Sequence, residues 1–317
     1  MAIIVYLETE NGNFKKTALE VSSYGRKLAD ETKTNLYGIT FNALEPLEIQ
    51  KYGVEKLTNI KTDHVFDVKI YADLLCKNFN DLGGTIFITG SSADSRFIFP
   101  VVSISLDAGY ATNVVEFPSS LSPLVLKRSV FTNKGFVFTE LKTNKKIIGI
   151  LNNSYGIHES ERKLEVKDYV PESIDSNLKV KSVKEDEEKI SIADAEIVVS
   201  GGRGLKGPEN WNLVEDLAKT LGAATACSKP VSDMGWRPHS EHVGQTGKPV
   251  ASNLYIAIGV SGAIQHLAGI NASKCKVVIN NDPEAPFFKA ADYGVIGDAF
   301  EVVPKLIDGL KKFKSKQ

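Results

Sequence analysis

Short apolar runs alternate with segments of helical spacing in the first half of the chain, and this alternation restricts the fold more than any other feature. The apolar runs are Ala2–Leu7, Asn35–Phe41 and Gly84–Thr89. Helical spacing of apolar residues fills Phe14–Thr32, and a Ser/Asp-rich turn after Thr89 leads into a second apolar helix. Strands that alternate with helices form parallel sheets with right-handed crossovers. The pattern therefore predicts an α/β fold.

A change of hydrophobic pattern and a change of composition divide the chain. Short β-like runs follow from Thr112 to Ile150, with a hairpin predicted across Asn133–Gly135. Residues 170–192 are polar, charged and poor in aromatics, which is the composition of a linker. We therefore place a domain boundary at about residue 185.

The α/β alternation begins again beyond this segment. The predicted strands are Glu196–Ser200, Tyr255–Gly259 and Lys276–Asn280, and the predicted helices are residues 209–221, 263–267 and 299–313. The sequence thus predicts two α/β domains. The N-terminal domain, residues 1–185, resembles nucleotide-binding α/β domains, and the C-terminal domain, residues 186–317, is built on a parallel sheet.

Charge and cysteine content exclude several functional classes. A net charge of −1 over 317 residues, with both signs mixed, gives no field for nucleic acid or an anionic membrane. The apolar runs are too short to cross a bilayer, so we expect no direct membrane insertion. The N-terminal MAIIVYLETE is interpreted as a first strand rather than a targeting segment. Cys76, Cys227 and Cys275 are far apart, which favours a reducing, cytoplasmic location without disulfides.

A glycine-rich turn follows the first strand of the second domain. Gly202, Gly204 and Gly207 satisfy G-x-G-x-x-G between a strand and a helix, where backbone N–H groups can approach a phosphate. Arg203 could add a bidentate phosphate contact. An NAD site also needs an acidic residue about 20 positions further on, and residues 224–229 contain none. A nucleotide-binding turn and a plain tight turn both remain open at this point.

Residues 227–255 form a long segment rich in Pro, Gly, Ser and His, without clean periodicity. Long irregular loops in compact domains are usually functional. The polar groups here are mostly neutral donors, with Lys229 as a cation, which is the composition of a ligand cradle. His239-x-x-His242 could share a metal, but no third ligand is placed, so we predict no metal site.

The apolar run LYIAIGVSGAIQHLAGI, residues 254–270, is interrupted by Ser261 and by Gln265–His266. Ile264, Leu267 and Ala268 keep i, i+3, i+4 spacing and are expected to pack inward. Gly259-Val260-Ser261-Gly262 lacks the full G-x-S-x-G elbow of hydrolases, and Ser261 and His266 on one short turn cannot form a triad. Taken alone, His266 would be a satisfied core histidine.

This run, with HVGQTGK before it and INNDPEAPFFKAADYGVIGDAFEVVPKL after it, closely resembles the α subunit of electron-transfer flavoprotein. The resemblance covers residues 195–310, including GGRGLKG and CSKPVSDMGW, whereas the N-terminal half matches only in length and texture. It implies that the C-terminal domain binds FAD, one per heterodimer, and that the chain pairs with a smaller β subunit, which in many members holds AMP. It also implies electron transfer from acyl-CoA dehydrogenases and related enzymes to a membrane quinone oxidoreductase, without bond-making catalysis by the chain itself.

The resemblance assigns roles within the FAD site. His266 would donate to the pyrimidine carbonyl of the flavin, and Thr246 would bond near its N5 atom. Asn280 and Asp298 would hold more distal parts, although Asn280 could simply belong to a turn and Asp298 to a helix cap. The residues assigned to the site are Arg203, Ser228, Lys229, Val243, Gly244, Gln245, Thr246, Ser261, Gly262, Ala263, Ile264, Gln265, His266, Asn280, Asp298 and Ala299.

One position departs from the family pattern. Lys229 stands where the family usually has an arginine that lies over the flavin ring. Lysine keeps the charge but loses the planar stacking surface and the forked donors. We therefore expect FAD binding to persist with altered flavin potentials.

Three other functions are compatible with the sequence to different degrees. A flavin-bifurcating member would carry a second FAD in the β subunit and accept electrons from NADH, and the deciding residues would lie on that partner. A non-redox nucleotide-binding module would bind a nucleotide without flavin colour. A plain NAD dehydrogenase is disfavoured, because the acidic ribose ligand and a proton-transfer constellation are missing.

Overall fold

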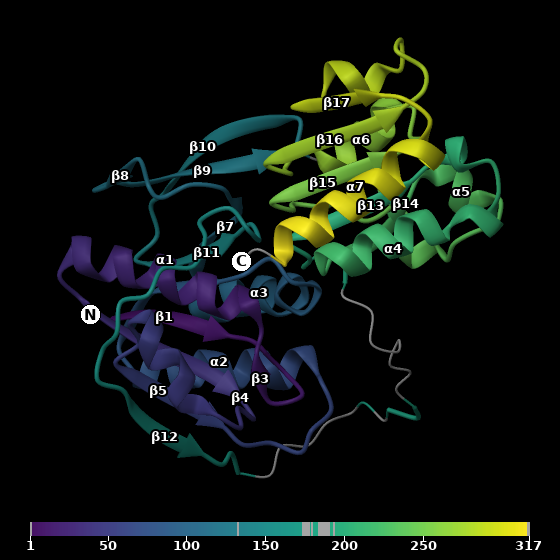
Figure 1. Ribbon diagram of the computed structural model, residues 1–317. Coiled ribbons are helices and arrows are strands. Elements are labelled where there is room, and N and C mark those ends of the chain that lie inside the picture. Colours follow the sequence, from purple (N-terminus) through teal and green to yellow (C-terminus); the bar gives the residue numbers. More distant parts are fainter. Residues whose placement is uncertain are drawn as a thin grey trace. The chain divides into compact units, whose positions relative to one another are not determined.

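The computed structural model of the protein describes residues 2–131, 133–172, 178, 180–182, 191–192 and 194–315. Two compact units account for them, one drawn from residues 2–182 and one built mainly from residues 191–315 (Figure 1). The boundary predicted near residue 185 and much of the polar segment 170–192 lie outside the described residues. Each unit is an α/β layer structure, as the strand and helix alternation predicts.

The first unit is built on a large, mostly parallel sheet. Its strand order is β10-β9-β7-β11-β6-β1-β4-β5-β12, with β8 beside β9. The strands of this sheet are β1 (Ala2–Leu7), β4 (Asn35–Phe41), β5 (Lys56–Ile60), β6 (Gly84–Thr89), β7 (Ala108–Val114), β8 (Ser120–Leu121), β9 (Leu124–Val130), β10 (Gly135–Leu141), β11 (Lys145–Ile150) and β12 (Glu165–Tyr169). The hairpin predicted across Asn133–Gly135 connects β9 to β10, which lie side by side at one edge. Two short strands, β2 (Thr9–Glu10) and β3 (Asn13–Phe14), pair separately.

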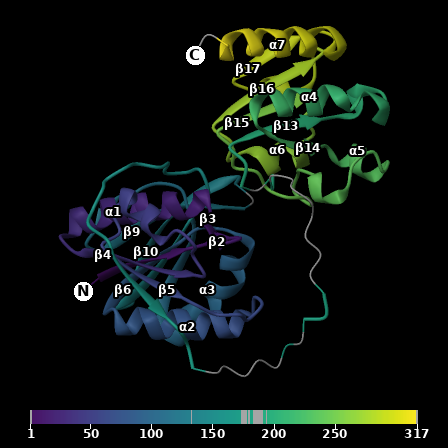
Figure 2. The same cartoon turned by 60° about the horizontal axis from the view of Figure 1, so that its bottom comes forward.

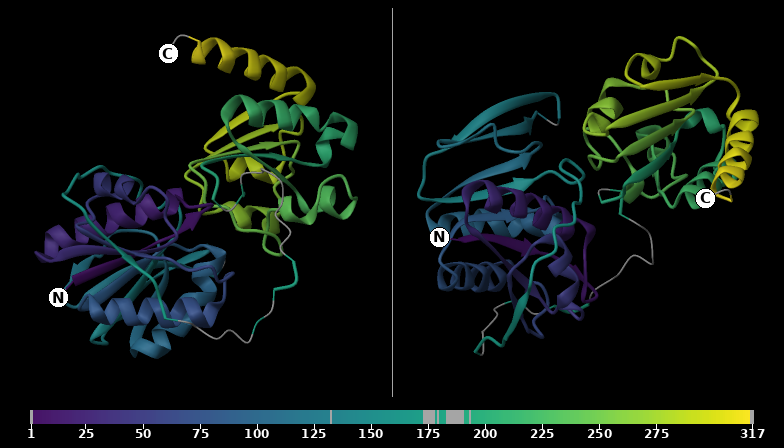
Figure 3. Two further views of the ribbon diagram at one scale, coloured as in Figure 1. Left: turned by 90° about the horizontal axis from the view of Figure 1, so that it is seen from below. Right: turned by 60° about the vertical axis from the view of Figure 1, so that its left-hand side comes forward.

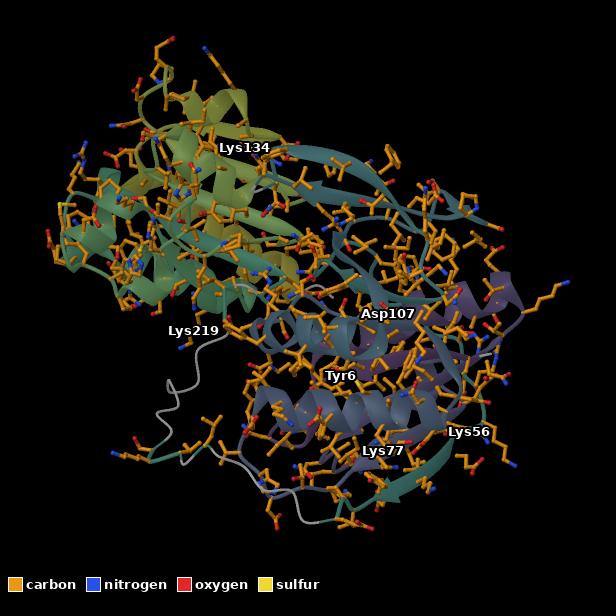
Figure 4. The ribbon with its side chains drawn as sticks, turned by 180° about the vertical axis from the view of Figure 1, so that it is seen from behind. Tyr6, Lys56, Lys77, Asp107, Lys134 and Lys219 are labelled. Carbon is orange, nitrogen blue, oxygen red and sulfur yellow. The ribbon has the colours of Figure 1, made fainter. Side chains whose placement is uncertain are left out.

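Helices cover both faces of this sheet, and the alternation of side chains along β1 shows why. Ile3, Val5 and Leu7 pack with α1 (Lys16–Thr32) on one face. Ala2, Ile4 and Tyr6 point to the opposite face, which α2 (Val68–Asp81) and α3 (Ala93–Leu106) cover (Figures 2 and 4). A strand covered on both faces is apolar throughout, which is why β1 is a continuous apolar run. A 3-10 helix (Pro46–Tyr52) precedes β5.

The second unit contains a five-stranded sheet in which every pairing is parallel. The spatial order is β14-β13-β15-β16-β17. Its strands are β13 (Ile197–Gly201), β14 (Ala224–Cys227), β15 (Leu254–Ile258), β16 (Cys275–Asn280) and β17 (Tyr293–Ile296). The chain passes from β13 to β14 on one side and then returns across β13 to β15 on the other. Ligands of open α/β sheets bind at such a reversal, beyond the carboxyl ends of the strands.

Helices again cover both faces of this second sheet. Val199 and Ile256 pack with α4 and α7, while Val198, Tyr255 and Ala257 pack on the opposite face, which includes α6 residues (Figure 3). The helices are α4 (Asn212–Leu221), α5 (Lys229–Asp233), α6 (Ile264–Ile270) and α7 (Ala299–Lys314). Short 3-10 helices are η2 (Arg203–Leu205), η3 (Pro208–Asn210), η4 (His239–Glu241) and η5 (Pro286–Lys289).

One packing prediction for α6 is wrong. Ala268 is buried and Leu267 packs against the core, but Ile264 is 69% exposed. The helix begins at Ile264, and helical side chains lean toward the N-terminus. The Ile264 side chain therefore projects beyond the end of this short helix instead of onto the sheet.

Candidate functional site

A cavity of about 600 Å³ opens at the carboxyl edge of the second sheet. Arg203 and Gly204 follow β13, Ser228 follows β14, and Ser261 lies in the turn after β15, while Asn280 ends β16. This volume lies within the range of roughly 300 to 1,000 Å³ that is usual for ligand pockets. The cavity therefore occupies the position that the strand order favours for a ligand.

The structure brings most of the sequence-predicted site residues to this one cavity. Those that line it are Arg203, Ser228, Lys229, Val243, Gly244, Gln245, Thr246, Ser261, Ala263, Gln265, His266 and Asn280. Gly262, Ile264, Asp298 and Ala299 are not among the lining residues. Lining residues that the sequence reasoning did not assign are Gly204, Pro230, His242, Gly259, Val260, Asp282 and Ala285. Gly204 stands in the glycine motif and His242 directly precedes Val243, so extending each predicted segment by one residue would have included both.

Asp298 and Ala299 have structural roles at the start of α7. The Asp298 carboxylate accepts a hydrogen bond from the Phe300 N–H at 3.0 Å, which is the geometry of a helix N-cap. Ala299, the first residue of α7, is buried in the core that α4 and α7 share with the sheet. The N-cap alternative for Asp298 is therefore confirmed, while a contact of Asp298 with a ligand stays a prediction.

The glycine-rich turn after β13 serves close packing between two turns. The Gly202 N–H donates to the Ile258 carbonyl at 2.8 Å, and the Gly204 N–H donates to the Gly259 carbonyl at 3.0 Å. A side chain on Gly202 would place its Cβ only 2.1 Å from the Gly259 oxygen. The Gly207 N–H is also bonded, to the Leu205 carbonyl. Of the two alternatives left open by the sequence, these bonds favour a close-packed turn, in which the glycines allow the turns after β13 and β15 to touch.

In contrast, the turn between β15 and α6 has backbone N–H groups that make no hydrogen bond to a described residue. Gly262 adopts φ +85° and packs its backbone against Phe287, whose N–H donates to the Ser261 carbonyl at 3.1 Å. Within the described part of the chain, the backbone N–H groups of residues 261–265 make no hydrogen bond. The first N–H groups of a helix have no partner within the helix and can bind a ligand.

Backbone hydrogen bonds hold the segment 242–250 against β14 and α6. The Val243 N–H donates to the Cys227 carbonyl at 3.0 Å, and the Gln245 N–H donates to the Gln265 carbonyl at 2.8 Å. A Cβ on Gly269 would lie 2.7 Å from the Gly244 backbone, so the segment and α6 touch through glycines. The predicted ligand cradle is thus a fixed wall of the cavity.

His266 on α6 also lines the cavity; it is 6% exposed, with its Nε2 atom 3.0 Å from the Tyr255 hydroxyl. Burial lowers the pKa of His266 from 6.5 to about 4, with a further lowering by His242 and an opposing effect of the Val243 backbone. His266 is therefore neutral at physiological pH. Its Nδ1 atom is buried without a hydrogen-bond partner among the described residues. Its predicted donation to a ligand carbonyl stays a prediction.

Several polar side chains at the cavity make no ion pair or capping hydrogen bond with other described residues. Arg203 and Lys229 are exposed and make no ion pair with another described residue. Ser228 occupies the cap position of α5, yet its hydroxyl makes no capping bond. Cations and free hydroxyls at the rim suit an anionic, hydrogen-bonding ligand.

No metal centre is evident in the part of the chain that the structure describes, because no three His, Cys, Asp or Glu side chains gather there. The rings of His239 and His242 lie 5.1 Å apart, and no third candidate ligand joins them among the residues that the structure describes. The described helices also include none with the length and apolarity to cross a bilayer.

Comparisons with known proteins agree for both units. Residues 3–173 match the electron transfer flavoprotein domain, and residues 191–271 match the electron transfer flavoprotein FAD-binding domain. Electron transfer flavoprotein subunit alpha of Syntrophomonas wolfei is 34% identical over 316 residues, covering 97% of this chain and 98% of that protein. The Bacillus subtilis subunit is 30% identical over 320 residues, with 98% and 97% covered. The mitochondrial subunit of Dictyostelium discoideum reaches 54% over 127 residues, with 40% and 36% covered.

Proposed function

The chain belongs to the electron transfer flavoprotein α-subunit family, and we propose that it binds one FAD in the cavity at the carboxyl edge of the second sheet and carries electrons as half of a heterodimer. The observation that carries this proposal is the convergence of the free donors on that cavity. The turn after β15 offers unbonded N–H groups, and Ser228, Arg203 and Lys229 offer unbonded polar side chains.

The residues present fit this cofactor. The N–H groups of residues 261–265, with Arg203, suit the negatively charged pyrophosphate, because oriented backbone donors and a guanidinium both stabilise anions. Val243, Gly244 and Thr246 form a wall pinned to α6, which suits a rigid ring system. His266, buried and neutral, would hydrogen-bond to the ring without adding charge. When bound, the flavin supplies the redox chemistry, and the chain orients it and sets its electrostatic surroundings.

The partner is proposed to be a β subunit of the same family, which would hold AMP. Exposed aromatic side chains support a surface that a partner protein covers: Phe136 and Phe138 on β10 are 60% and 65% exposed. Exposed apolar patches commonly mark protein interfaces. We expect the isolated chain to be poorly soluble or to lose flavin, whereas a soluble isolated chain with a full complement of FAD would contradict an obligate heterodimer.

The proposed electron donors are acyl-CoA dehydrogenases, and the proposed acceptor is a membrane quinone oxidoreductase, with the complex acting in the cytoplasm as part of fatty acid β-oxidation. Family membership supports this assignment. The test mixes the flavin-loaded heterodimer anaerobically with an acyl-CoA dehydrogenase and its acyl-CoA substrate. Bleaching of the flavin bands is expected with this donor and not with NADH. Bleaching by NADH alone would favour the bifurcating alternative instead.

A further inference from the structure

His242 is a buried cavity residue whose imidazole makes no hydrogen bond to any described residue. It is 2% exposed, follows η4, and is held by a bridge between its backbone and Cys227. Its Nδ1 atom is enclosed and has no partner in the described part of the chain. The Nε2 atom makes no hydrogen bond to any described residue either. Buried polar groups are nearly always satisfied, so an imidazole with two unused nitrogens indicates a missing partner.

The position of Nε2 indicates where that partner would lie. His242 and Gly244 both line the cavity. A Cβ built on Gly244 would lie 3.4 Å from His242 Nε2, so only a glycine hydrogen stands at that place. Gly247 packs against the same ring from the backbone side, with its Cβ position 2.9 Å from the ring. Of the two ring nitrogens only Nδ1 is enclosed, so Nε2, which has no partner either, is the accessible nitrogen of a side chain that lines the cavity.

The charge state of His242 makes it a single donor. Burial lowers the pKa of His242 below 6.5, and His239 and Lys229 lower it further, while Asp233 opposes them. A neutral imidazole carries one N–H. A proton on the enclosed Nδ1 would leave a buried donor without an acceptor, which costs free energy. The proton therefore belongs on Nε2.

Resting on the proposed function, we propose that His242 is a further cofactor-binding residue whose Nε2–H donates a hydrogen bond to an acceptor atom of the bound flavin nucleotide. This role differs from that of His266, whose Nε2 already lies at the Tyr255 hydroxyl. It also gives a partner to a ring nitrogen that no described residue bonds.

The experiment uses the full chain co-produced with its β subunit, stripped of flavin and titrated with FAD. His242→Phe keeps a ring of similar size but removes the donor, and it should weaken FAD binding about tenfold, the cost of one unmade buried hydrogen bond. His242→Gln places an amide N–H near the same point and should restore affinity to within about threefold of the parent. His239→Phe is the matched control, because His239 is exposed and does not line the cavity, and it should bind as the parent does.

A second readout does not depend on the variants folding. In ¹⁵N-histidine spectra of the parent complex, the His242 ring should show the Nε2–H form before FAD is added and a shifted Nε2 resonance afterwards. Equal FAD affinity of His242→Phe and parent, equal losses in the Phe and Gln variants, or an unshifted Nε2 resonance would each overturn the assignment of His242 alone. A parent complex that binds no FAD would overturn the proposed function and this inference together.

Discussion

A buried ion pair fixes the segment that forms one wall of the cavity, and breaking it gives a sharp test of the structure. The Arg237 guanidinium donates to both carboxylate oxygens of Glu241, at 2.7 and 2.6 Å. The two side chains are 15% and 7% exposed. Arg237 also donates to the half-exposed Glu215 on α4 at 3.0 Å and lies over the Trp211 ring. Glu241 directly precedes His242, so this pair anchors the cavity wall to α4.

Glu241→Gln removes the charge and one of the two acceptors while keeping the size of the side chain. A hydrogen bond to a charged group contributes about 1.5 to 3 kcal/mol, and removing one partner of a buried pair costs about 3 to 5 kcal/mol. Because Arg237 keeps Glu215 and the glutamine carbonyl, the expected loss of unfolding free energy falls below the range for a fully broken pair, at about 2 to 3 kcal/mol.

The assay is urea unfolding followed by tryptophan fluorescence, since both tryptophans, Trp211 and Trp236, belong to the second unit. Glu215→Gln is the matched control: it removes a carboxylate from the same arginine, but one that is 52% exposed, and should cost no more than about 1 kcal/mol. Added salt should reduce the effect of the control variant more than that of Glu241→Gln. Equal losses in the two variants would refute the claim that burial makes the Glu241 pair the anchor.

Three further predictions concern pH, packing and charge. The pKa of His266 falls from 6.5 in the unfolded chain to about 4 in the folded one, so the unfolded state binds the proton first as the pH drops. The second unit should therefore lose stability between about pH 6.5 and pH 4, which urea midpoints measured across this range should show. A pH dependence that is unchanged in the His266→Gln variant would contradict this assignment. Gly204→Ala would place a Cβ 2.8 Å from the Gly259 backbone and should destabilise the second unit by about 1 to 3 kcal/mol in the same urea assay. Gly309→Ala in α7 is the control: its added Cβ has no atom within 4 Å, so the variant should be neutral or stabilising. Lys229→Arg should raise the reduction potential of the bound flavin, because a planar guanidinium can lie over the ring, and an unchanged potential in a spectroelectrochemical titration would remove that role for position 229.

Strands that are buried on both faces, and helices that bury one clear apolar stripe, could be predicted from the sequence. The limits of β4 and β6 coincide with the predicted runs, because these strands lie inside the sheet. The edge strands β12 and β17 gave no signal: every residue of β17 is exposed, so no apolar run marks it. Polar edge strands depend on their neighbours for pairing and carry little pattern of their own.

The composition of the cavity was predictable from motifs, whereas its internal bonding was not. Val243, Gly244 and Gln245 could be placed near the ligand, but their hydrogen bonds to Cys227 and Gln265 join distant parts of the chain. Gly202 and Gly204 have the spacing of a phosphate-binding turn, and only the approach of Gly259 shows that their N–H groups are already used. Contacts between backbones leave no trace in periodicity, so they become visible only in the folded chain.

The most direct test of the central claim is the visible absorption spectrum, with quantified flavin, of the chain co-produced with its β subunit. We expect the bands of oxidised flavin with one FAD per heterodimer, and loss of that flavin when Gly262 is replaced by valine, since its φ of +85° and its contact with Phe287 admit no side chain. A colourless complex, or flavin retained in full by the Gly262→Val variant, would contradict the assignment of this cavity as the FAD site.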